Sequence, residues 1–311
     1  MADRKPLQPL GFIALPPHTG KGGFDHAAPH VASGHIYVAH TANDAVDVFD
    51  PASGRHLFSI PDLPGAAGVL VSDEAQLIIA SARRENTIGV FGPGPGPAVR
   101  KAEVGVQPNG LAFDAGRGTI LVANLGDPTA PGSHTLSIVD LGSLTMRGSI
   151  PLPGSTRWAL YDAHTDAYYV NISDPSQIVV IDGSRPDRIA RVLLVPAAGA
   201  HGLDLDPATH RLFCACDAAT LVTLDARSGS VLNQQPLSGK PDVVWFNRQR
   251  RQLYVAIGDP GVIDVFDTGS LKKLATVATE KGAHTTALAP AGDRVYAFLP
   301  ATHRVAVYQV A

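Results

Sequence analysis

The chain has little cysteine, no long apolar run and no excess of positive charge, and each shortage excludes a class of protein. Only two cysteines occur in 311 residues, which excludes a disulfide framework. No window approaches the roughly 18 consecutive apolar residues of a membrane-spanning helix, and residues 1–20 contain no apolar run long enough for a signal peptide. Acidic residues outnumber basic ones by 28 to 25, unlike the basic footprint of a nucleic-acid-binding protein. We therefore expect a cytoplasmic protein that binds neither membrane nor nucleic acid.

Several common catalytic motifs are also absent. The chain contains no Gly-x-Ser-x-Gly nucleophile elbow and no His-Glu-x-x-His zinc motif. The two cysteines, Cys214 and Cys216, lie two apart on an alternating segment, so both side chains point to one face of a strand. Small buried core residues explain this pair better than a redox or metal pair does.

What the chain does contain is a unit that recurs seven times. In each copy two small or polar residues precede one variable residue, and alternating apolar and polar residues follow, as in Gly199–Asp206. A turn, a second strand of the pattern apolar-Tyr/Leu-Val-Ala, a third alternating strand and a more polar fourth strand complete the unit. Four strands in a unit of about 40 to 49 residues are typical of β-propeller blades. The sequence predicts an all-β, seven-bladed β-propeller with four antiparallel strands per blade, forming a single domain over residues 1–311.

The two ends of the chain indicate how the ring closes. The last repeat stops after its third strand, at 309–311, whereas a lone strand-like segment, Leu7–Leu15, precedes the first repeat. We expect this N-terminal segment to complete the last blade as its outer strand. Such closure removes the exposed strand edges that an open array of sheets would leave.

The variable residue of the repeat defines a set of candidate functional residues, called here the mouth column. Equivalent positions in a propeller lie on a circle about its axis, and the turn into the innermost strand opens at the mouth of the central channel. In chain order the column reads His26, Ala67, Asn109, Arg157, His201, Asp242 and His284. Its histidines and its aspartate come from blades five, six, seven and one, which are consecutive in a closed ring. Three imidazoles and a carboxylate suit a borderline divalent ion. We therefore predict a site for Zn²⁺, Mn²⁺ or Fe²⁺, with Cu²⁺ also compatible, formed by His26, His201, Asp242 and His284.

The last residue of the second strand is expected to reach the same face. This second column places His40 beside His26, so His40 could move a proton if it is not itself a metal ligand. Arg157, across the channel, could grip a substrate carboxylate in two-pronged fashion. His40 and Arg157 are therefore the predicted catalytic residues. Three amides and one flat apolar side chain are predicted to bind the substrate: Asn109, Asn124, Trp158 and Asn171.

The repeat also resembles a known family. The segment Tyr37–Asp50 is similar to the repeat of the YVTN-type β-propeller proteins, which include lactonase-like and YncE-like propellers, and Leu121–Asn124 and Leu253–Ala256 fit the same pattern. The resemblance covers nearly the whole chain and implies a seven-bladed propeller. Such propellers include lactonase-like enzymes, lyases and binding proteins, so it implies no single activity. The predicted ligand set departs from the carboxylate-and-amide site of gluconolactonase-like enzymes, so their substrate is not carried over.

Two functions follow as hypotheses. The first is a metal-dependent enzyme that acts on a small polar or anionic molecule at the channel mouth, the ion activating water or polarising a substrate oxygen. Its reaction would be lactone or ester hydrolysis or a lyase elimination, with an iron-dependent oxygenase as a further possibility. The alternative is a non-catalytic module that binds a ligand or a protein through a structural polar ring. The mouth column differs from blade to blade, which favours a small-molecule site, and we expect a monomer or a weak oligomer.

Overall fold

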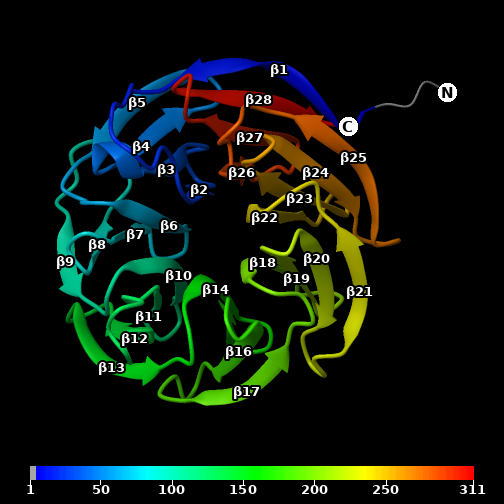
Figure 1. The fold of residues 1–311 in the computed structure, drawn as a ribbon. Helices are drawn as coiled ribbons and strands as arrows, with labels where there is room; N and C mark the ends of the chain where they lie inside the picture. Colours follow the sequence, from blue (N-terminus) through cyan, green and yellow to red (C-terminus); the bar gives the residue numbers. More distant parts are fainter. Residues whose placement is uncertain (1–4) are drawn as a thin grey trace.

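The computed structural model describes residues 5–311, whose strands form seven four-stranded antiparallel sheets around a central axis (Figure 1). Each sheet is one blade, and its strands are ordered from the axis outwards. The all-β, seven-bladed β-propeller predicted from the repeat is confirmed. No helix of the described residues is long and apolar enough to cross a membrane.

The first four blades take their strands from consecutive segments of the chain. Blade 1 contains β2 (Ala27–Pro29), β3 (Ile36–His40), β4 (Ala45–Asp50) and β5 (Arg55–Ile60), with a 3₁₀ turn at Thr41–Asn43 between β3 and β4. Blade 2 contains β6 (Ala66–Ser72), β7 (Leu77–Ala82), β8 (Thr87–Phe91) and β9 (Arg100–Glu103). Blade 3 contains β10 (Pro108–Asp114), β11 (Thr119–Asn124), β12 (Thr135–Asp140) and β13 (Thr145–Pro151). Blade 4 contains β14 (Thr156–Asp162), β15 (Ala167–Ile172), β16 (Gln177–Asp182) and β17 (Ile189–Leu194).

The remaining blades continue this order until the last one, which also takes the first strand of the chain. Blade 5 contains β18 (Ala200–Asp206), β19 (Arg211–Cys216), β20 (Thr220–Asp225) and β21 (Val231–Pro236). Blade 6 contains β22 (Pro241–Asn247), β23 (Gln252–Ile257), β24 (Val262–Asp267) and β25 (Lys272–Ala278). Blade 7 contains β26 (Thr286–Leu288), β27 (Arg294–Leu299), β28 (Arg304–Val310) and, outermost, β1 (Leu7–Ala14).

The predicted closure of the ring is confirmed. Strand β1 pairs antiparallel with β28, from Leu7 opposite Val310 to Ala14 opposite Arg304. The backbone N–H of Ala311 also donates to the carbonyl of Pro6 over 3.0 Å. Leu7 and Val310 are buried in one apolar cluster between blades 6 and 7. Hydrogen bonds and apolar contact thus hold segments from both ends of the chain in one blade.

The core lies between the faces of adjacent blades. The second strand of a blade is covered by a neighbouring blade on both faces, so it reads as a continuous apolar run, and β3 is buried along its whole length. Tyr37 in β3 and Tyr254 in β23 are fully buried there, which explains the recurring apolar-Tyr-Val-Ala pattern. The outer strand β5 alternates between exposed and partly buried residues, because only one of its faces meets another blade.

A β-bulge lies near the start of most inner strands. The register shifts between Ala66 and Val69 in β6, and equivalent shifts occur in β10, β14, β18 and β22. A bulge inserts extra residues and changes the direction of a side chain. In these five blades the residue of the mouth column lies within the bulge. Backbone hydrogen bonds also connect adjacent blades. The N–H of His26, just before β2 of blade 1, donates to the carbonyl of Ala67 in β6 of blade 2 over 3.1 Å.

Candidate functional site

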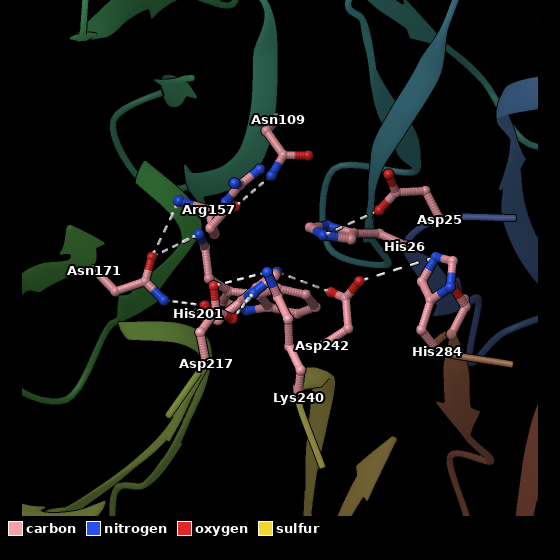
Figure 2. Close-up of polar contacts among 12 residues, drawn as sticks. Asp25, His26, Asn109, Arg157, Asn171, His201, Asp217, Lys240, Asp242 and His284 are labelled. Carbon is pink, nitrogen blue, oxygen red and sulfur yellow. Dashed lines mark hydrogen bonds and ion pairs between the residues drawn. The ribbon is translucent and has the colours of Figure 1, made fainter. Parts of the chain in front are cut away.

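A cavity of about 210 Å³ lies where the inner strands begin. It is called here the mouth cavity, and it is lined by every member of the mouth column except Ala67. Figure 2 shows His201 and Asp242 side by side at its centre, with Arg157 and Asn109 on one side and His26 and His284 on the other. The structure therefore brings the four predicted metal ligands and Arg157 to one cavity.

His201 stands between two carboxylates. Its Nδ1 is 2.7 Å from Oδ1 of Asp217, and its Nε2 is 3.4 Å from Oδ1 of Asp242. Burial lowers the pKa of His201, but the charge of Asp242 and the hydrogen bond to Asp217 outweigh burial and raise the pKa to about 9. Burial also favours the protonated form of Asp242, but His201 and His284 hold the pKa of this carboxyl well below its usual range. At neutral pH the pair is therefore an imidazolium facing a carboxylate.

The other two histidines flank this pair and differ in their surroundings. His284 donates from Nδ1 to the carbonyl of Gly282 over 2.8 Å, and its Nε2 is 3.9 Å from Oδ2 of Asp242. His26 instead directs Nε2 towards Oδ1 of Asp25, 3.4 Å away, and its ring packs on Trp158 with 4.0 Å between the centroids. Burial lowers the pKa of His26 and keeps the imidazole neutral at pH 7.

The divalent-ion site predicted from the sequence stays a prediction: its four residues share the cavity, and its three histidines each face a carboxylate. Within residues 5–311, no three His, Cys, Asp or Glu side chains come together as a metal-holding group. Nε2 of His201 and Nε2 of His284 both face Asp242, but Nε2 of His26 faces Asp25 instead. A metal would also displace the proton that His201 holds with a pKa of about 9, beside two guanidinium groups in the same cavity.

The two arginines of the mouth cavity differ in their partners. Arg83 lies with Nη2 3.0 Å from Oδ2 of Asp25, and it also donates to Oδ1 of Asn109. Arg157 forms no ion pair with an acidic side chain of the described chain, and Nε of Arg157, like Nε of Arg83, is buried without a hydrogen-bond partner. The lining thus carries the charges of two guanidinium groups and an imidazolium against two acidic side chains, so an excess of positive charge faces the cavity.

Asn109 and Asn171 hold the backbone of Arg157. Nδ2 of Asn109 donates to the carbonyl of Arg157 over 2.7 Å. Oδ1 of Asn171 accepts from the N–H groups of Arg157 at 3.2 Å and Trp158 at 2.8 Å, and its Nδ2 donates to the carbonyl of His201. Asn171 is fully buried and does not line the mouth cavity, so its predicted position at the mouth is wrong. Asn109 lines the cavity, but its amide already has partners. Both residues act by positioning Arg157.

The predicted positions of His40 and Asn124 at the mouth are also wrong. Both are fully buried and neither lines the mouth cavity. His40 lies 2.7 Å from Asp47 and 2.8 Å from His18, and Asn124 donates from Nδ2 to the hydroxyls of Ser137 and Thr135 over 3.0 Å each. The second strand lies between the first and third strands of its blade, so its last side chain meets neighbouring strands instead of the channel.

The turn after the second strand supplies the residues that the sequence prediction missed. Thr41 and Arg83 line the mouth cavity from such turns in blades 1 and 2, and Asp217 reaches His201 from the corresponding turn of blade 5. Two further missed residues lie outside these turns. Lys240 lies 2.9 Å from Asp217, and Asp25 directly precedes His26 in the sequence. Thr41, Arg83 and Asp217 lie one or two residues beyond the second column, and this short spacing is the signal that could have found them.

Fold and site together define a seven-bladed β-propeller with a charged cavity at the mouth of its channel. No protein-family model matches the chain. The chain is 27% identical over 197 residues to "Uncharacterized protein YncE" of Salmonella typhimurium (strain LT2), and 26% identical over 197 residues to the protein of that name from Salmonella typhi. Each alignment covers 61% of this chain and 54% of the relative, so the match spans about half the length of these curated relatives.

A solved structure agrees with the fold. The chain is similar to Kuenenia stuttgartiensis Hydrazine Synthase with a TM-score of 0.82 and 13% identity, covering 95% of this chain and 97% of that chain. At this identity the likeness shows the fold alone. The sequence similarity to the two YncE proteins and the seven-bladed fold together support a YncE-type propeller family.

Proposed function

We propose that the mouth cavity binds a small carboxylate-bearing molecule, with Arg157 as its main anchor. The observation that carries this proposal is the guanidinium of Arg157, which lines the cavity with its Nε buried and without a partner. A buried donor left unpaired destabilises a protein, and a guanidinium matches a carboxylate in two-pronged geometry. A bound carboxylate would supply the missing partner.

The charge of the surrounding side chains supports the same ligand class. The imidazolium of His201 adds positive charge to that of Arg157, while Asp25 is already paired with Arg83. Lys240 and Asp217 form a pair beside the cavity and balance each other. An anion would therefore enter a cavity whose excess charge is opposite to its own.

Acid–base chemistry on the bound anion is a second candidate function, favoured by the row Asp217–His201–Asp242. Asp217 orients the imidazole through Nδ1, which leaves Nε2 towards Asp242. An imidazolium held in this way can protonate a leaving oxygen, and Asp242, whose pKa is held well below its usual range, stays ionised and stabilises the imidazolium. Lactone or ester hydrolysis and lyase elimination both need a proton donor for the leaving oxygen. No step of this scheme needs a metal ion.

The affinity for a carboxylate is expected to fall as the pH rises through about 9, because His201 then loses its proton and its charge. Between pH 7 and pH 10 we expect butyrate to bind roughly tenfold more weakly, the effect of one charge-assisted contact. Calorimetric titration with butyrate at each pH measures this change in affinity, and neutral butyramide is the control ligand. The His201→Gln variant should bind with a flat pH profile, and His164→Gln, at an exposed turn, should retain the wild-type profile. Equal binding of butyrate and butyramide would refute an anion site.

Metal content tests the metal-dependent hydrolase or lyase predicted from the sequence. Since residues 5–311 contain no group of three His, Cys, Asp or Glu side chains placed to hold a metal, we expect elemental analysis of the purified protein to find no stoichiometric Zn, Mn or Fe. Melting temperatures with and without a chelator should then coincide. If the wild type contains one equivalent of metal and His201→Ala contains none, the metal site predicted from the sequence is supported. That result would contradict the acid–base scheme above.

A further inference from the structure

A second cavity of about 310 Å³ continues the channel inwards from the mouth and is called here the chamber. Its lining residues follow those of the mouth cavity along the same inner strands: Trp158 comes after Arg157 in β14, and Gly110 and Leu111 come after Asn109 in β10. The other walls come from β2, β6 and β22, which surround the axis in Figure 1. His26 lines both cavities, so the chamber adjoins the mouth cavity.

The chamber is apolar where the mouth cavity is charged. Apart from His26, its lining consists of alanine, valine, leucine, proline, tryptophan and glycine. Trp245 uses its indole N–H in a 2.8 Å hydrogen bond to the carbonyl of Thr286. Trp158 turns one ring face to the neutral imidazole of His26. Apolar walls with a few polar groups at one end are typical of sites that orient a small organic molecule.

We infer that the ligand is an amphipathic carboxylate, whose anionic group binds Arg157 in the mouth cavity and whose hydrocarbon tail occupies the chamber. The inference rests on the proposed anion site and adds the tail. The two cavities are adjacent and differ in character, so a ligand with one charged and one apolar end satisfies both at once. A short polar anion would leave the walls of Trp158 and Trp245 in contact with water, which disfavours binding relative to a ligand with a tail.

Chain length should therefore control affinity. Transfer of one methylene from water into an apolar site strengthens binding about fourfold. Octanoate has four more methylenes than butyrate, so its dissociation constant should be roughly 250-fold lower. The protein reports this binding itself, because the chain contains two tryptophans and both line the chamber. Tryptophan fluorescence of the full chain, titrated with butyrate, hexanoate and octanoate, measures the series, and the matching neutral amides are the control ligands.

A variant that fills the chamber separates the tail from the anionic group. Val71, partly buried in β6, lines the chamber and does not line the mouth cavity. Val71→Phe should lose most of the gain in affinity from butyrate to octanoate, and the ratio of the two dissociation constants is the readout. The matched control is Val192→Phe on the outer strand β17, where the side chain is 46% exposed and distant from the channel. Circular dichroism and the melting temperature check that both variants fold.

The outcomes distinguish the tail from the anion site. A steep dependence on chain length that is reduced in Val71→Phe supports the inference, and if that variant does not fold, the wild-type series still decides. Equal affinities for butyrate and octanoate, with carboxylates still preferred over amides, would overturn the amphipathic ligand and leave the anion site intact. Amides that bind as tightly as acids at every length would overturn the anion site and this inference with it.

Discussion

Arg157→Ala is expected to weaken carboxylate binding about a hundredfold, the value of a paired, charge-assisted contact. The loss should be this large because no other guanidinium of the cavity is free: Arg83 already pairs with Asp25 and with Asn109. Arg157→Lys retains the charge but not the two-pronged geometry, so its affinity should lie between those of the wild type and Arg157→Ala. Tryptophan fluorescence titration with octanoate measures all three proteins.

The stability of the Arg157 variants supplies the internal check. The guanidinium of Arg157 has no protein partner in the described chain, so its removal should leave the free energy of unfolding unchanged or slightly raised. Arg147→Ala is the matched control, because this side chain lies on outer strand β13 and is 61% exposed. Arg147→Ala should bind octanoate with the affinity of the wild type. A full-affinity Arg157→Ala protein would refute the assignment of Arg157 as the anchor.

Asp47→Ala is expected to lower the free energy of unfolding by about 3 kcal/mol. Asp47 in β4 is fully buried, lies 2.7 Å from Nδ1 of His40 and accepts a 2.6 Å hydrogen bond from Ser59. His40 in turn lies 2.8 Å from His18, which follows β1, and His18 lies 3.2 Å from His303 in the turn before β28. These contacts join blade 1 to the segments that close the ring. Without the carboxylate, the buried imidazole of His40 and the hydroxyl of Ser59 lose this partner.

Denaturant unfolding at pH 7.5 measures this loss. Burial and the neighbouring His40 and His303 lower the pKa of His18 below 6.5, so His18 is neutral at that pH and its titration does not confuse the comparison. The control is Asp182→Ala at the end of β16, an exposed aspartate whose side chain bonds only within its own turn. Asp182→Ala should lower the free energy of unfolding by less than about 1 kcal/mol. Equal costs for the two variants would show that Asp47 does not secure the closure.

The positions of the candidate site were predictable to the level of the repeat. Equivalent residues of a closed ring must surround the axis, so His26, His201, Asp242 and His284 could be assigned to one mouth before any coordinates. Their interactions could not, because Asp217 and Asp25 come from turns whose side-chain directions no periodicity describes. Those two carboxyl groups and Arg83 form ion pairs that the sequence prediction did not include.

The second column shows a different limit. A period of two places His40, Asn124 and Asn171 at equivalent strand ends, but it does not say whether a strand end meets the channel or the next blade. Packing decided that question: the inner strand covers these side chains, and the bulges direct the residues of the mouth column into the channel.

The sequence alone determined the seven blades, the order of their strands and the closure by β1, because alternation and repeat length are local properties that each blade satisfies by itself. Only the tertiary structure decided which polar groups meet at the mouth, which of them are left without a partner and where the apolar chamber lies. Those features depend on contacts between residues from different blades, whose distances are set by the closed ring and not by any stretch of the chain.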